Sequence, residues 1–252
     1  MSTVKTIADF LDRELDTGAF DDLSHNGLQV ANSGRVGTVC SGVDASMEFF
    51  EAARRRGAGL IICHHGLSWG DSLKRITDLN YRRLAFLIQN DMALYASHLP
   101  LDAHPRHGNN ALICRAMGLR ELKPFGLYQG RKIGFEGRLP RPLSYEAFKK
   151  RAARQLGRDV QSMDFGKKTV RRVAVVSGGA AGEIEEAGCK GVDVFLSGEP
   201  ALPAYRLAQE YGIHAIFGGH YATEVFGVRA LADVVRRRFG VKAEFIDLRV
   251  PY

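Results

Sequence analysis

The sequence lacks the long apolar run of a membrane-spanning helix. No stretch of its 252 residues approaches the roughly 20 consecutive apolar residues that crossing a bilayer requires. The first eleven residues also lack the apolar segment and cleavage site of a secretory signal, and they favour an amphipathic first helix instead. We therefore expect a cytoplasmic protein with no membrane partner.

Cysteines are few and scattered. The four are Cys40, Cys63, Cys114 and Cys189, and no two form a Cys-x-x-Cys pair. Three lie in apolar or helical surroundings, which is typical of buried thiols in a reducing compartment. The spacing favours buried thiols over a disulfide framework, and a metal site in this chain is not expected to use thiolates.

The formal net charge is +7, but aromatic residues do not alternate with the basic residues as a single-strand nucleic-acid surface would require. The positive charge is concentrated in short runs, at residues 54–56, 149–151, 167–172 and 236–238. Solvated helix faces are the favoured interpretation. Attraction of a small anionic substrate is the alternative, and nucleic-acid binding has weaker support.

Apolar segments alternate with helical patterns along the chain. The predicted strands are 36–44, 59–63, 92–96, 131–139, 172–177, 192–199, 213–217 and 243–247, and the predicted helices are 45–56, 78–90, 107–117, 143–156 and 201–211. Several strands are continuously apolar, which indicates sheets covered by helices on both faces. The fold class is therefore α/β, with mixed sheets covered by helices.

A change of composition near residues 123–126 predicts two domains. We assign residues 1–124 to a first α/β half and residues 125–252 to a second, with a metal site in the cleft between them. As an alternative for the last part of the chain, the C-terminal segment packs back on the first half.

Five metal-binding side chains stand where strands end or helices begin. His64 and His65 follow the apolar run 59–63, and Asp102 lies shortly after the run 93–96. Two further candidates are His220, which follows the run 213–217, and Glu224, four residues beyond it. If residues 220–224 are helical, these last two side chains share one face. Taken separately, each has a structural alternative: a capped strand end for the histidine pair, a helix or turn cap for Asp102, and a solvated first helix turn for residues 220–224.

These five ligands favour two divalent ions over one. Adjacent strand residues point to opposite faces, so His64 and His65 converge on one site only if the strand bends where it ends. A carboxylate such as Asp102 can bridge two ions about 3.5–4 Å apart. Imidazole and carboxylate ligands suit Zn, Fe, Mn, Co or Ni. Five ligands leave coordination positions open for water or substrate, which is typical of a catalytic site.

Two other residues are candidates for catalysis. His98 precedes Asp102 by four positions and is either a proton shuttle, a partner that orients a ligand, or a structural histidine. Glu199 ends a predicted strand and either holds a water or a ligand imidazole, or is a helix N-terminal charge. His104 and His214 are assigned structural roles.

At these residues the chain resembles the NGG-interacting-factor-three-like family, also called GTP cyclohydrolase I type 2 homologues. The resemblance covers most of the chain and rests on the motifs at 26–30, 41–44, 63–66, 97–102, 197–199 and 219–224. It implies two α/β domains, a short form without the family's mid-chain insertion, and a two-metal centre held by the same five ligands, His64, His65, Asp102, His220 and Glu224. One departure is His25, which replaces the acidic residue common before the Asn-Gly-Leu-Gln motif.

Three functions follow as hypotheses. The first is a metal-dependent hydrolase acting on a nucleotide or another phosphate-bearing heterocycle, resembling a GTP cyclohydrolase. The second is a metal-binding or metal-delivery protein without turnover. The third, ranked last, is a ring-shaped scaffold that binds nucleic acid or protein.

The family resemblance predicts a homo-oligomer, most simply a hexamer built as a trimer of dimers. Light scattering at micromolar concentration should give a mass several times the 27.8 kDa of one chain. A mass of one chain at every concentration would rule this assembly out.

Overall fold

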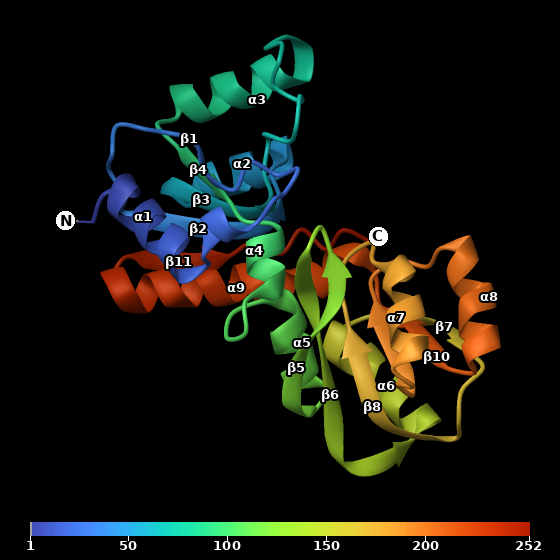
Figure 1. The fold of residues 1–252 in the computed structure, drawn as a ribbon. Helices are drawn as coiled ribbons and strands as arrows, with labels where there is room; N and C mark the ends of the chain where they lie inside the picture. The colour runs from blue at the N-terminus through green and yellow to red at the C-terminus, as the bar shows by residue number, and fades with distance from the viewer. Residues whose placement is uncertain (1) are drawn as a thin grey trace. The chain divides into compact units, whose positions relative to one another are not determined.

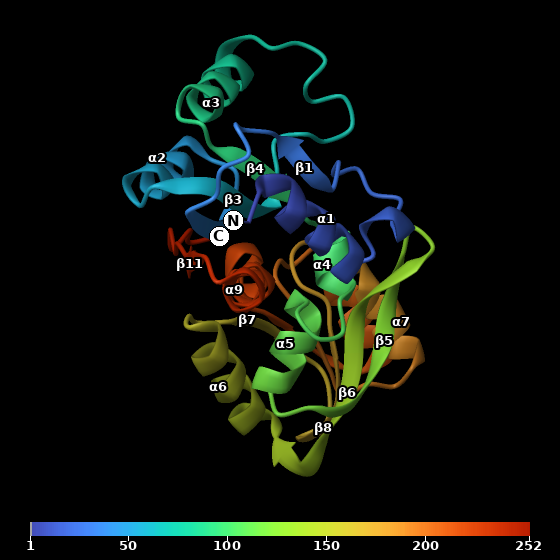
Figure 2. The ribbon, with the colours of Figure 1, turned by 90° about the vertical axis from the view of Figure 1, so that its left-hand side faces the viewer.

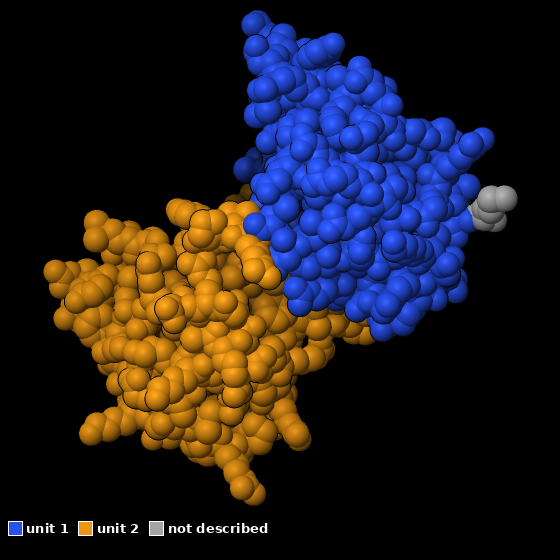
Figure 3. Space-filling view, turned by 180° about the vertical axis from the view of Figure 1, so that it is seen from behind, with its two compact units in different colours: residues 1–101, 227–248 blue, residues 102–226, 249–252 orange. Residues whose placement is uncertain are grey.

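The computed structural model describes residues 2–252, which form two compact units (Figure 3). Unit 1 comprises the chain up to residue 101 together with residues 227–248, and unit 2 comprises residues 102–226 and 249–252. Residue 124, the division predicted from the sequence, lies within a strand of unit 2. Asp102 therefore belongs to the same unit as His220 and Glu224. Residues 227–248 belong to unit 1, as in the alternative considered for the C-terminal segment.

Unit 1 contains a five-stranded sheet in the order β1-β4-β3-β2-β11, in which only β1 is antiparallel to its neighbour. Its elements are α1 (Val4–Glu14), η1 (Thr17–Ala19), β1 (Gly27–Val30), β2 (Thr38–Asp44), α2 (Met47–Arg55), β3 (Ala58–His65), α3 (Asp78–Gln89), β4 (Ala93–Ala96) and β11 (Lys242–Phe245). Helices α2 and α3 cover one face of the sheet, and α1 and the end of α9 cover the other (Figures 1 and 2). Two helices cross the unit boundaries: α4 (Leu99–Ala103) and α9 (His220–Phe239).

Unit 2 contains a six-stranded mixed sheet in the order β5-β6-β8-β9-β10-β7. The parallel strands β8, β9 and β10 form its middle, and the pairs β5–β6, β6–β8 and β10–β7 are antiparallel. Its elements are α5 (Asn109–Ala116), β5 (Arg120–Tyr128), β6 (Arg131–Ser144), α6 (Tyr145–Leu156), β7 (Gln161–Asp164), β8 (Thr169–Val175), η2 (Ala181–Glu183), α7 (Ile184–Cys189), β9 (Val194–Ser197), α8 (Leu202–Tyr211) and β10 (His214–Phe217). Helices α5 and α6 cover one face, and α7 and α8 the other (Figure 1).

The predicted α/β class with mixed, helix-covered sheets is confirmed. The central strands β3, β4, β9 and β10 are almost wholly buried, which explains their continuous apolar sequences. Strand β5 was not predicted, because most of its side chains are exposed and it lies at a sheet edge, where no continuous apolar run is required. None of the helices in residues 2–252 combines the length and the apolar composition that a bilayer crossing demands.

Close packing between α2 and β2 sets the core of unit 1. The Phe49 ring is fully buried, and a Cβ atom added to Gly42 would lie only 2.6 Å from it. Ser46 begins α2, because its side chain accepts a hydrogen bond from the Phe49 backbone nitrogen at 3.2 Å.

Replacing Phe49 with alanine should therefore leave a cavity and lower the free energy of unfolding by about 3–5 kcal/mol. Ile88→Ala on α3 is the control, since Ile88 is 66% exposed and its loss should change stability by no more than about 0.5 kcal/mol. Urea unfolding followed by circular dichroism compares the two variants. Equal midpoints would show that Phe49 does not anchor this core.

Candidate functional site

Three histidines of unit 1 stand at one edge of its sheet. His64 and His65 end β3, and His98 follows β4. Strands β3 and β4 run parallel with Cys63 opposite Ala96, so their carboxyl ends lie at the same edge. One nitrogen of each imidazole lies within 4.8 Å of one nitrogen of each of the other two. The ring centroids of His64 and His65 are 4.8 Å apart, so these adjacent residues converge where the strand ends.

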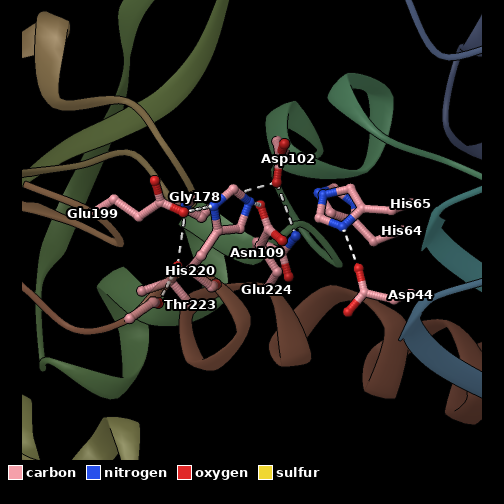
Figure 4. A network of polar contacts seen from close by, with 12 residues as sticks. Asp44, His64, His65, Asp102, Asn109, Gly178, Glu199, His220, Thr223 and Glu224 are labelled. Atoms are coloured by element: carbon pink, nitrogen blue, oxygen red, sulfur yellow. Dashed lines mark hydrogen bonds and ion pairs between the residues drawn. The ribbon is translucent and has the colours of Figure 1, made fainter. Parts of the chain in front are cut away.

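The Nδ1 atoms of His64 and His65 face hydrogen-bond acceptors of the protein. Nδ1 of the buried His64 is 2.9 Å from the Ser97 carbonyl oxygen, and Nδ1 of His65 is 2.8 Å from Oδ1 of Asp44 (Figure 4). Asp44 ends β2 directly beside His65 in the parallel pair. These contacts favour the tautomer in which Nδ1 carries the proton and Nε2 the lone pair that binds a metal.

His98 has a carboxylate partner that was not predicted from the sequence. Its Nδ1 lies 3.0 and 3.1 Å from the two oxygens of Asp22, whose side chain is 2% exposed. Asp22 also accepts hydrogen bonds from the backbone nitrogens of Ser24 and Leu99 and from the Asn26 amide. Burial raises the pKa of Asp22, but the hydrogen bond and charge of His98, with the other donors, outweigh burial and hold the pKa at about 2.

In unit 2, His220 and Glu224 occupy the first turn of α9 and share one face, as their spacing predicts. Nε2 of His220 is 3.0 Å from Oε1 of Glu224, which is 2% exposed. The other ring nitrogen, Nδ1, makes a short hydrogen bond to Glu199 after β9 (Figure 4). Burial lowers the pKa of His220, but the contacts with Glu224 and Glu199 outweigh it and raise the pKa to about 9. Metal binding through Nε2 would therefore release a proton.

Asp102 is held by neighbours within unit 2. It is 5% exposed, and its Oδ1 accepts hydrogen bonds from Nδ2 of Asn109 at 2.8 Å and from the Ser177 hydroxyl at 3.0 Å. Figure 4 shows Asn109 beside this carboxylate. Neither partner was predicted, although Ser177 ends the same apolar run that Gly178 follows. The contacts orient a carboxylate that carries only acceptor atoms when it is ionised.

The turn after β8 contains Gly178, which lies close to two candidate ligands. Its φ is +65°, and a Cβ atom there would lie 2.5 Å from Oε1 of Glu224 and 3.2 Å from Nε2 of His220. Its backbone nitrogen donates to the Thr223 hydroxyl at 3.0 Å, which holds the turn against α9. The glycine at position 178 is therefore explained by its close approach to two candidate ligands.

The other histidines have structural contacts. His104 accepts hydrogen bonds at Nδ1 from the backbone nitrogens of Arg106 and His107. The His214 ring stacks on Tyr145 with centroids 3.5 Å apart. Cys63 is fully buried, and burial raises the pKa of its thiol well above the usual range, so a thiolate ligand is disfavoured.

The donor sets fit divalent transition metals. Each unit presents imidazole nitrogens whose Nδ1 atoms are fixed by acceptors, and unit 2 adds the carboxylates of Asp102 and Glu224. Contacts of this kind orient metal ligands and set their tautomer. The close approach of Gly178 keeps a side chain out of the space beside His220 and Glu224. One dinuclear centre that uses both sets stays a prediction from the sequence.

The fold and these donor sets define a two-unit α/β protein with histidine and carboxylate groups that could hold a metal ion. The profile of the family described as Duf34/NIF3 (NGG1p interacting factor 3) matches residues 2–250. The chain belongs to this family, which confirms the resemblance recognised in the sequence.

Individual relatives agree over nearly the full length. A protein of Deinococcus radiodurans named GTP cyclohydrolase 1 type 2 homolog is 44% identical over 238 residues, covering 94% of this chain and 90% of the relative. Among solved structures, the protein ybgI, described as of unknown function, has a TM-score of 0.93 at 33% identity, covering 99% of this chain and 100% of that one. TTHA1606 of Thermus thermophilus has a TM-score of 0.90 at 34% identity, with coverage of 99% and 100%.

Substituting alanine for Gly178 should displace Glu224 and lower the metal content of the protein. The control is Gly191→Ala, because Gly191 has nearly the same φ, +62°, but nothing within 4 Å of its added Cβ. Both variants should lose about 1–2 kcal/mol of stability through the left-handed backbone. Elemental analysis and thermal melting compare them, and equal metal contents would show that Gly178 does not shape the site.

Proposed function

We propose that this protein holds two divalent ions in a dinuclear centre and hydrolyses a nucleotide or a related phosphate-bearing heterocycle. The ligands are the unit 1 set, His64 and His65, and the unit 2 set, Asp102, His220 and Glu224. The observation that carries the proposal is the fixing of all five side chains by polar contacts within their own units. When bound, two ions supply an activated water near neutral pH and polarise the electrophile.

The protein's own residues orient the ligands and move protons. Glu199 holds Nδ1 of His220 and is the candidate for proton transfer, because its carboxylate already shares a hydrogen bond with a ligand imidazole. His98 is the second candidate for this role, and Asp22 holds its Nδ1 at 3.0 Å. Asp44 fixes the ring of His65. Glu199 and Asp44 each restrict the rotation of a proposed ligand imidazole and so favour one productive geometry.

The substrate class rests on charge and on the names of relatives. The net charge of +7 favours anionic substrates. The relatives named GTP cyclohydrolase 1 type 2 homolog make GTP the first compound to test. Hydrolysis of a nucleotide panel should be measured with metal-loaded protein, metal-depleted protein, and depleted protein restored with metal. Turnover that follows the metal supports the hydrolase, whereas two bound ions without turnover of any nucleotide would support metal binding or delivery alone.

The bridging role assigned to Asp102 predicts a specific pattern of metal loss. Asp102→Ala should lower occupancy of both metal positions and abolish any hydrolysis, whereas Glu224→Ala should weaken chiefly one position. Asp102→Ala should also lower the free energy of unfolding by about 1–3 kcal/mol, because Asn109 and Ser177 lose their acceptor. Elemental analysis with anomalous scattering reports the two occupancies.

The matched control is Asp193→Ala. Asp193 is another aspartate of unit 2 that accepts two hydrogen bonds, from the backbone nitrogens of Arg171 and Arg172. This variant should lose stability but keep both ions. Retention of two ions by Asp102→Ala would exclude the bridge, and complete unfolding would identify Asp102 as a structural residue.

A further inference from the structure

We propose that unit 2 carries a binding site for inorganic phosphate beside an irregularity in the pairing of β5 with β6. Lys123, Arg138 and Arg172 bind the phosphate oxygens. Glu121 accepts a hydrogen bond from the P–OH group of the anion. The site goes beyond the proposed function and uses none of its five candidate metal ligands. It also gives a role to part of the basic run at residues 167–172, which the metal ligands leave unexplained.

The site is a cavity of about 240 Å³ where β5, β6 and β8 lie side by side in one sheet (Figure 1). Six residues of these strands line it: Glu121, Lys123, Glu136, Gly137, Arg138 and Arg172. All six belong to unit 2, so the cavity is contained within one unit. It is smaller than the pockets of about 300–1,000 Å³ that drug-sized ligands occupy, which suits a small anion.

A β-bulge lies beside the cavity. The register of β5 with β6 shifts between Arg120 and Lys123, so that two residues of β5 stand opposite Gly137 alone. The first of these two, Glu121, has a φ of +55°, which is uncommon for a residue other than glycine. Gly137 permits the bulge, because a Cβ atom added there would lie 2.7 Å from the Leu122 side chain and 3.0 Å from the Arg120 carbonyl oxygen. The bulge therefore breaks the regular pairing next to the basic side chains.

Three arginines are register partners across the three strands. Arg138 of β6 stands opposite Arg120 on β5 and opposite Arg172 on β8. Like charges that face each other directly across a strand pair destabilise a sheet. Within residues 2–252, the side chains of Arg138 and Lys123 have no acidic partner that would offset this repulsion. An anion bound in the cavity would offset it.

The guanidinium of Arg172 is fixed by its neighbours. Its Nη1 donates to the Lys190 carbonyl oxygen at 2.7 Å, and its Nη2 lies 3.4 Å from Oε2 of Glu136. Glu136 is shared between two cations, because its Oε1 also lies 3.8 Å from Nζ of Lys190. The Glu136 carboxylate therefore does not neutralise the other cations of the lining. A guanidinium held in this way binds an oxyanion with less loss of side-chain freedom.

The second acidic residue of the lining selects between anions. Glu121 has no side-chain partner in the described part of the chain, and an ionised carboxylate only accepts hydrogen bonds. Inorganic phosphate keeps a P–OH group at neutral pH and can donate it to this carboxylate. Sulfate is fully ionised, carries acceptors alone and is repelled. Several cations together with one unpaired carboxylate therefore favour phosphate over sulfate.

The test is a calorimetric titration of the full-length protein with sodium phosphate and with sodium sulfate, at equal ionic strength and about pH 7.5. Each titration is repeated after chelation of metal, so that phosphate bound to an ion is recognised. We expect phosphate to bind roughly 10-fold more tightly than sulfate. Methyl phosphate, which loses its last proton near about pH 6, should bind as weakly as sulfate.

Four variants locate the site. Lys123→Gln and Arg138→Gln should each weaken phosphate binding by roughly 10-fold, because each removes a charge-assisted hydrogen bond. Glu121→Gln supplies an amide that can donate to either anion, so sulfate should gain roughly 10-fold and the preference for phosphate should disappear. Arg141→Gln is the matched control, since Arg141 is an exposed arginine of β6 outside the cavity lining. It removes the same charge and should leave phosphate binding unchanged within about twofold.

The outcomes are distinct. Loss of phosphate affinity in Lys123→Gln and Arg138→Gln, with the Arg141→Gln control unchanged, supports the site. The site is overturned if the parent protein binds no phosphate at about 10 mM, if chelation abolishes binding, or if all three variants bind as the parent does. Equal affinities of the parent for phosphate and sulfate would overturn the selection by Glu121. Circular dichroism establishes that each variant is folded, and if Arg138→Gln is not, Lys123→Gln decides the question.

Discussion

Parallel pairing of β3 with β2 on one side and β4 on the other is the constraint on which the unit 1 site depends. Because the three strands run in the same direction, their carboxyl ends lie at one edge of the sheet. Asp44 ends the first strand, His64 and His65 end the second, and His98 follows the third. Residues more than thirty positions apart in the chain thereby become neighbours, as is usual for sites at the strand ends of α/β proteins.

Imidazoles that are wholly or partly removed from solvent require partners, and in unit 1 the fold supplies them from adjacent strands. Burial of a polar group without a hydrogen bond costs several kcal/mol in an apolar medium. His64 meets the Ser97 carbonyl and His65 meets Asp44, so each ring is stabilised by the next strand in the sheet. Unit 2 uses the same principle on a helix, where Glu199 fixes His220 and Gly178 leaves room for Glu224. The contacts that stabilise these side chains also fix their orientation.

Most elements of the fold were predictable because their patterns are local. The buried strands are continuous apolar runs, and the helices begin at residues such as Ser46 and Ser144 that cap their first turns. The edge strand β5 was not predictable, since an exposed edge needs no apolar run. The predicted domain division at residue 124 followed composition. Each compact unit instead combines two segments that are distant in sequence.

The sequence by itself determined the α/β class, the family, and the candidate ligands, because their residue types and motifs are read directly along the chain. Only the tertiary structure decided which groups hold those ligands. Asp22 carries no local signal, and the motif that ends in Asp44 does not reveal its partner; they contact His98 and His65 from segments 76 and 21 positions away. Hydrogen bonds act over about 3 Å in space, so partners this far apart in sequence are specified by the pairing of strands and the packing of loops.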